Sequence, residues 1–165
     1  MDTFFNSEDF PYLRPLKENF HDILAEYNSA TFSPAPFPYV NIYNEGWYVY
    51  GLKYKDVQIS SICARFPKTW SVIQSVDAHI YTCGFSILKP GCEITPHDGS
   101  ADSVEGILRG HLCLKTNPDC ALTVGGITKS WVEGELLIFD DFTEHSAYNR
   151  GTTDRVALLF DFYRK

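Results

Sequence analysis

The sequence predicts a single domain that is mainly β, of the jelly-roll type. Its 165 residues fit one domain, and a hydrophobic fraction of 44% is enough to bury a core. Twelve Phe, ten Tyr and three Trp favour strands, whereas nine Pro and a single Met weigh against a bundle of long helices. Many short strand-like segments separated by turn residues fill the second half of the chain, as they do in sandwiches and barrels.

The charge balance argues against two classes of partner. The formal net charge is −7, and both nucleic acids and anionic membranes are bound through clustered Lys and Arg. We therefore expect no nucleic-acid or membrane partner. No apolar run approaches membrane-spanning length and no signal-like segment begins the chain, so we expect a cytoplasmic protein. The five cysteines lack CxxC spacing and are expected to be reduced and mostly buried.

Residues 1–79 are predicted to form a support of helices and strands for the rest of the domain. Apolar residues at helical spacing predict an amphipathic helix over 15–29. Three alternating prolines make 31–39 an extended connector without regular structure. Two β-favouring runs with a turn between them predict two strands within 46–61, and a short helix is expected after Pro67.

Residues 80–165 are predicted to form the jelly-roll core. Runs of β-favouring residues alternate there with Gly, Pro, Asn and Asp turns, and no internal repeat is found. The predicted strands are 80–88, 107–116, 121–124, 127–131, 135–139, 145–148 and 155–163.

Two of the five histidines are candidates for a metal site. His97 ends a strand just before a polar loop, and His145 opens another strand after a short acidic turn. Both positions are expected at the mouth of the roll, where two neutral imidazoles can share one divalent metal such as Fe or Zn. The alternative from spacing alone is a pair of ordinary surface histidines.

A carboxylate two residues after the first histidine would complete a facial triad of two His and one acid, but Gly99 stands there. The neighbouring acids Asp98 and Asp102 are poorly placed, because Asp98 would point to the opposite face and Asp102 would need the loop to fold back. Water can fill the gap if a nearby acid holds it, and Asp140 or Asp141 is close enough in sequence to His145 to do so.

Arginines stand out inside two of the predicted strands. Arg109 alternates with His111, which places both side chains on one face of a largely buried strand, and Arg155 opens the last strand. A buried guanidinium needs an anion, and a bound dicarboxylate would serve. The alternative for either arginine is an internal ion pair with one of the 21 acids of the chain.

Several ordered motifs together resemble the aspartyl/asparaginyl β-hydroxylase family of iron(II)- and 2-oxoglutarate-dependent oxygenases. With weaker similarity toward the N-terminus, the resemblance covers nearly the whole chain. The segments that carry it are 85–91 (FSILKPG), 96–99 (PHDG), 109–112 (RGHL), 131–135 (WVEGE), 139–145 (FDDFTEH) and Arg155.

The resemblance implies a double-stranded β-helix, with N-terminal helices packed on it, that uses Fe(II), O₂ and the cosubstrate 2-oxoglutarate. It implies that His97 and His145 are the iron ligands, and that water completes the coordination where Gly99 replaces an acid. By the same resemblance, Asp141 contacts that water. The positions that match those holding the 2-oxoglutarate carboxylates are Ser86, Arg109, His111 and Arg155.

The activity implied is hydroxylation of an unactivated C–H bond with release of succinate and CO₂. The expected substrate is a free amino acid or a peptidyl Asp or Asn residue. Another small molecule or a lipid acyl chain remains open, because members of the family differ in substrate. Two further alternatives are halogenation at the same centre and a jelly roll that binds a metal or small acid without chemistry. The sequence predicts no particular oligomeric state.

Overall fold

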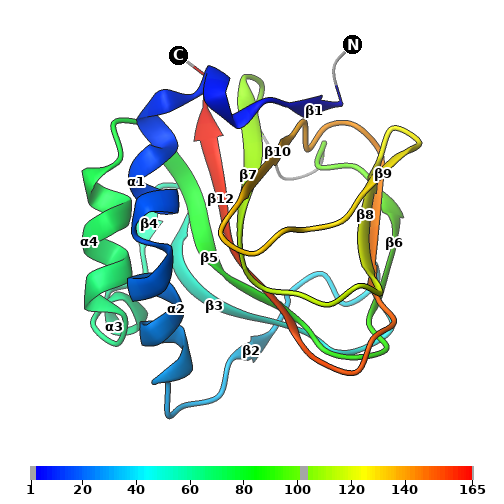
Figure 1. Ribbon diagram of the computed structural model, residues 1–165, viewed down its shortest axis with the longest axis horizontal. Coiled ribbons are helices and arrows are strands. Elements are labelled where there is room, and N and C mark those ends of the chain that lie inside the picture. The colour runs from blue at the N-terminus through cyan, green and yellow to red at the C-terminus, as the bar shows by residue number, and fades with distance from the viewer. Residues whose placement is uncertain (1–2, 101–103, 165) are drawn as a thin grey trace.

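Strands β5 to β12 form an antiparallel jelly roll made of two sheets (Figure 1). Strands β10, β7, β12 and β5 are neighbours in the larger sheet, and β6, β11, β8 and β9 make the smaller one. Successive strands alternate between the sheets except at the β8–β9 hairpin, which is the order of a double-stranded β-helix. The prediction of a mainly β jelly roll is confirmed. The computed structural model describes residues 3–100 and 104–164.

Within these described ranges, the larger sheet has eight strands and the smaller one has four. The larger sheet contains β1 (Phe4–Phe5), β2 (Ala35–Pro36), β3 (Trp47–Tyr54), β4 (Val57–Gln58), β5 (Ile80–Leu88), β7 (Ile107–Lys115), β10 (Leu136–Phe139) and β12 (Arg155–Tyr163). The smaller sheet contains β6 (Glu93–His97), β8 (Cys120–Val124), β9 (Ile127–Lys129) and β11 (His145–Asn149). The helical elements are η1 (Ser7–Asp9), η2 (Pro11–Leu13), α1 (Arg14–Glu18), α2 (Phe20–Asn28), α3 (Ser60–Cys63) and α4 (Pro67–Ser75).

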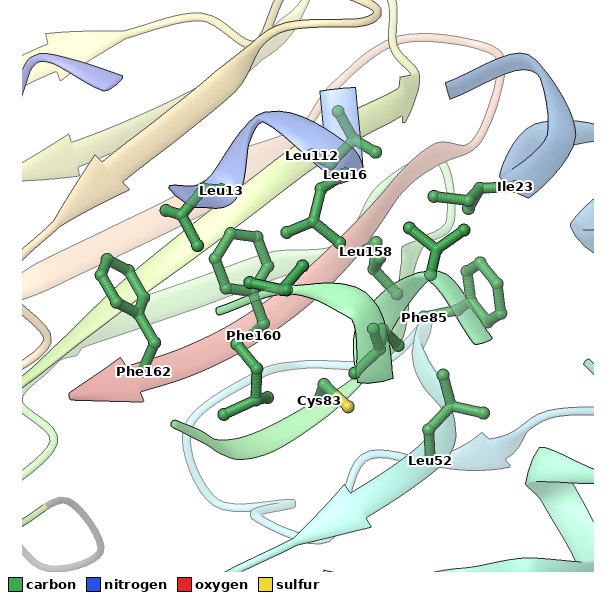
Figure 2. Close-up of a cluster of buried hydrophobic side chains, with 14 of the residues drawn as sticks. Leu13, Leu16, Ile23, Leu52, Cys83, Phe85, Leu112, Leu158, Phe160 and Phe162 are labelled. Atoms are coloured by element: carbon green, nitrogen blue, oxygen red, sulfur yellow. The ribbon is translucent and has the colours of Figure 1, made fainter. Parts of the chain in front are cut away.

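The N-terminal part of the chain widens the larger sheet and covers its outer face. Strand β3 pairs with β5, and β1 pairs with β10 at the opposite edge. Helices α1, α2 and α4 lie against the face turned away from the smaller sheet (Figure 1). Apolar side chains fill the space between these layers (Figure 2); among them are Leu13, Leu16, Ile23, Phe85, Leu158 and Phe160.

The two-residue period of the strands separates this outer core from the inside of the roll. On β12 the residues Val156, Leu158, Phe160 and Phe162 belong to the outer core. The alternate positions of that strand face inward and begin with Arg155. The same alternation on β7 turns Arg109 and His111 inward, as the sequence predicted. Arg109, His111 and Arg155 therefore all point into the inside of the roll.

Most predicted segments are confirmed, and two expectations were wrong. The helix expected over 15–29 is two helices, because the chain leaves helical geometry at Asn19, whose side-chain amide donates to the Pro15 carbonyl at 2.7 Å. The connector 31–39 contains the short strand β2, which pairs with β3. The two strands expected within 46–61 are present as β3 and β4, and α3 begins at Ser60 soon after the second one ends.

Two further expectations concern cysteines and membranes. All five cysteines are buried free thiols, as predicted. Across residues 3–100 and 104–164, no helix has both the length and the apolar character needed to cross a membrane.

Candidate active site

His97 and His145 lie side by side on neighbouring strands of the smaller sheet. They are direct partners in the register between β6 and β11, and their ring centroids are 4.4 Å apart. His145 is buried and His97 is half-buried at the mouth of the roll. The structure therefore brings together two histidines that lie far apart in the sequence.

Backbone carbonyls select the tautomer of both rings. Nδ1 of His97 lies 2.7 Å from the Thr95 carbonyl oxygen, and Nδ1 of His145 lies 2.7 Å from that of Thr143. A carbonyl oxygen only accepts, so in the neutral form of each ring Nδ1 carries the hydrogen and Nε2 keeps the lone pair. Burial also lowers the pKa of His145 to about 4, which keeps this ring neutral near pH 7. Neutral rings oriented in this way are typical of metal ligands.

Asp141 occupies the space that a side chain at position 99 would need. A Cβ added to Gly99 would lie 2.7 Å from Asp141 Cγ, which is closer than real Cβ atoms approach, and the Gly99 N–H donates to the Asp141 carbonyl at 2.8 Å. Asp98 is exposed and accepts from the Ser100 N–H, while Asp102 lies outside the described residues. The described residues contain no cluster of three or more His, Cys, Asp or Glu side chains suited to a metal.

Arg109 is paired with two carboxylates of the chain. Its Nε and Nη2 donate to the two oxygens of Asp161 at 2.7 and 2.9 Å, and its Nη1 lies 2.7 Å from Asp141 Oδ1. Asp141 Oδ1 in turn lies 3.4 Å from His145 Nε2. The internal ion pair considered as the alternative for an isolated arginine is therefore present here. That Arg109 holds a 2-oxoglutarate carboxylate stays a prediction.

Arg155 has a different environment, although its guanidinium is buried as well. Its Nη2 donates to Ser86 Oγ at 3.1 Å, and its guanidinium lies 4.7 Å from the centre of the Trp131 ring. Its Nε and Nη1 are buried without a hydrogen-bond acceptor among the residues described. Burial lowers the pKa of Arg155 to about 10, so the side chain still carries its charge at neutral pH.

His111 adds a third donor. Its Nδ1 accepts from the Trp131 indole N–H at 3.0 Å, so in the neutral ring the hydrogen is on Nε2. That Nε2 is buried and has no acceptor within the described structure. Burial, reinforced by the charges of Arg155 and Arg109, holds the pKa of His111 well below its usual value. Three buried N–H groups on two neighbouring strands thus lack an acceptor, as in a site built for an anion.

Two adjoining cavities collect the predicted site residues. A small one of about 30 Å³ is lined by Ser86, His97, Arg109, His111, His145 and Arg155. A larger one of about 400 Å³ shares Ser86, His97 and Arg109 with it and also meets Asp141. The structure therefore gathers all seven residues named from the sequence around two cavities that share lining residues.

Three residues beside these were not assigned to the site from the sequence. Trp47 is stacked on Phe37 and also donates its indole N–H to Ser86 Oγ at 3.0 Å. Trp131 orients His111, and Asp161 pairs with Arg109. A signal for Asp161 was present, because it lies an even number of residues after Arg155 in an otherwise apolar strand and so shares its face.

A solved structure has a similar fold. It is an oxidoreductase of the 2OG-Fe(II) oxygenase family from Burkholderia pseudomallei, with a TM-score of 0.61, 13% identity and coverage of 93% of this chain and 90% of that one. Together with the strand order, this similarity defines the fold class as the double-stranded β-helix of such oxygenases.

The chain belongs to the aspartyl/asparaginyl β-hydroxylase family, whose model matches residues 17–165. It is 32% identical over 162 residues to the human aspartate β-hydroxylase domain-containing protein 2, covering 90% of this chain and 43% of that protein. It is 35% identical over 121 residues to the ornithine lipid ester-linked acyl 2-hydroxylase of Rhizobium tropici, covering 72% of this chain and 41% of that protein. The chain thus spans less than half the length of these curated relatives.

Proposed function

We propose that the protein is an Fe(II)- and 2-oxoglutarate-dependent hydroxylase. The observation that carries the proposal is the set of three buried donors without an acceptor among the described residues, Arg155 Nε, Arg155 Nη1 and His111 Nε2, next to two histidines whose Nε2 atoms keep a lone pair. A bound anion would accept hydrogen bonds from the three donors, and a metal cation next to it would bind the two Nε2 atoms. Membership of a hydroxylase family supports the same conclusion.

The residues fit both the metal and the cosubstrate. His97 and His145 would hold Fe(II) through Nε2, because neutral imidazole is a suitable ligand for iron. Arg155, helped by Ser86, would bind one carboxylate of 2-oxoglutarate, and His111 would donate to the same ligand. When bound, iron and 2-oxoglutarate would activate O₂, of which one oxygen atom would oxidise 2-oxoglutarate to succinate and CO₂ and the other would hydroxylate the substrate C–H bond.

In this proposal Asp141 does not bind the metal itself. It compensates for the missing triad acid by holding a water at that position. Its carboxylate stands where a side chain at position 99 would stand, and it lies beside His145 Nε2. A water held there would be oriented by the carboxylate, because an anionic acceptor fixes a water through its O–H groups. This arrangement agrees with the expectation for the Gly99 form of the site.

The substrate is expected in the larger cavity, and its walls bear on the choice among substrates. The exposed surface of the lining is mainly apolar, and Phe37, Tyr39, Ile59 and Leu159 contribute to it. The charged residues of the lining are balanced, with three acids (Asp98, Asp141 and Asp161) and three cations (Lys53, Lys55 and Arg109). An apolar chain therefore fits as a second candidate beside the amino acid or peptidyl Asp or Asn. The Rhizobium relative is named as an acyl hydroxylase, which supports that candidate.

Binding and turnover test the proposal separately. With Mn(II) in place of iron, 2-oxoglutarate should raise the melting temperature of the purified protein, and His97→Ala or Arg155→Met should abolish the shift. With Fe(II), ascorbate and 2-oxoglutarate, a pool of amino acids, peptides and acyl compounds should raise succinate release above background. Absence of both the thermal shift and succinate would reject the hydroxylase, whereas binding without turnover on any candidate would favour a non-catalytic binder.

A further inference from the structure

We propose that Asp161 is a positioning residue, which fixes the Arg109 guanidinium and through it holds the Asp141 carboxylate against the metal site. The inference rests on the proposed function for the identity of that site. Asp161 lies on β12 and is only 5% exposed. Burial of a charged side chain costs free energy, so a buried acid is retained for a specific interaction. None of the roles proposed for the metal, the cosubstrate or the substrate involves Asp161.

The contact between Asp161 and Arg109 is of the kind that sets an orientation. Two parallel N–H···O bonds of 2.7 and 2.9 Å join the Nε and Nη2 edge of the guanidinium to both carboxylate oxygens. Such a paired geometry defines the plane of the guanidinium as well as its position. The two residues are also cross-strand partners in the register between β7 and β12, so the backbone holds both ends of the contact.

The remaining edge of Arg109 then reaches Asp141. With Nε and Nη2 occupied, Nη1 is the group that lies 2.7 Å from Asp141 Oδ1. The long Arg109 side chain borders both cavities, so without the paired bonds to Asp161 it has room to turn together with Asp141. The Asp141 carboxylate would then lose the support that keeps it between Gly99 and His145.

The charges of the trio agree with this arrangement. One guanidinium between two carboxylates leaves one net negative charge next to the imidazoles of His97 and His145. A divalent cation at the histidines is therefore favoured by the trio as a whole. The same net charge also means that removing Asp161 acts in two ways, by position and by charge, and the experiment has to separate them.

Crystal structures of the metal-free protein test the positioning step directly. In Asp161→Asn we expect Arg109 to turn and the Asp141 carboxylate to leave its place beside Gly99. If Asp141 stays in that place, the proposal is overturned. Asp161→Glu keeps the charge and lengthens the side chain by one methylene, and it gives the same test if the Asn variant does not fold.

Co(II) binding, followed by its visible absorption, separates position from charge. We expect Asp161→Asn and Asp141→Asn each to weaken Co(II) binding about tenfold, the usual effect of removing a group that orients a metal site. If Asp161 acts through Asp141, the double variant binds Co(II) as weakly as Asp141→Asn alone. Losses that multiply in the double variant would overturn the proposal in favour of a charge effect.

A matched control and the wild type complete the design. Asp22→Asn removes an acid that pairs with Lys68 at 3.1 Å on the helical layer, and it should leave Co(II) binding unchanged. A wild-type protein that binds neither Co(II) nor 2-oxoglutarate would reject the proposed function. In that case the crystal structures of Asp161→Asn or Asp161→Glu still decide whether Asp161 positions Asp141.

Discussion

Lowering the pH should destabilise the metal-free protein through His145. Burial lowers the pKa of this ring to about 4, from an ordinary value near 6.5 in the unfolded chain. Between these two values the unfolded state binds a proton that the folded state does not. Stability therefore rises with pH across this window and is lost as the pH falls from about 6.5 toward 4.

The size of the effect follows from the same two values. A difference of roughly 2.5 pKa units corresponds to about 3 kcal/mol once the pH is below both values. Between pH 7 and pH 5 the loss from His145 alone is about 2 kcal/mol, because most of the window lies in that interval. His111, whose pKa burial also lowers, adds a loss of the same sign. Comparing variants at His145 removes that shared contribution.

Urea unfolding of the metal-free protein at pH 7 and pH 5 measures this difference. His145→Asn keeps a polar side chain without a titrating ring, so its free energy of unfolding should fall by about 2 kcal/mol less than that of the wild type. Ser146→Ala on the same strand changes no titrating group and should lose as much stability as the wild type. Equal losses in the wild type and His145→Asn would refute a neutral, buried His145.

Three further changes address the anion site, the metal site and the larger cavity. Arg155→Lys keeps a charge but loses the planar donor set, and it should weaken 2-oxoglutarate binding in the presence of Mn(II) by about tenfold or more in calorimetry. An unchanged affinity would show that the anion binds elsewhere. Gly99→Ala forces its Cβ onto Asp141, so Co(II) binding should weaken by about tenfold or more, and unaltered binding would contradict the role of Asp141. Gly51→Val directs its side chain toward Ile59 in the larger cavity and should block substrate turnover while 2-oxoglutarate still binds, whereas full turnover would place the substrate elsewhere.

The longer strands were predictable because each carries its own signal. An alternation of apolar and polar or small residues marks the face of a strand, and the bounds of β5 and β12 agree with the predicted 80–88 and 155–163. The break between α1 and α2 was not, because the apolar spacing continues across Asn19 while a local hydrogen bond interrupts the helix. The four-residue helix α3 is too short for its spacing to be recognised.

The site was only partly predictable for a related reason. The motifs identify which residues gather, and the structure brings all of them to the two cavities. Motifs do not say which acid each arginine meets, because Arg109 and Asp161 are 52 residues apart and meet only through the register of β7 and β12. A pairing of this kind depends on how strands are ordered in the sheet, which neither residue encodes locally.

The two arginines therefore have different environments, although both point into the inside of the roll. By sequence, Arg109 and Arg155 are equivalent: each is a lone cation in a buried strand of an acidic chain. In the structure Arg109 contacts two carboxylates, whereas Arg155 contacts a serine hydroxyl and an indole face. A buried cation in contact with neutral groups is stabilised by an incoming anion more than one that is already paired with carboxylates. Under the proposed function, an anionic cosubstrate would therefore bind at Arg155, while Arg109 would position the acids beside the proposed metal site.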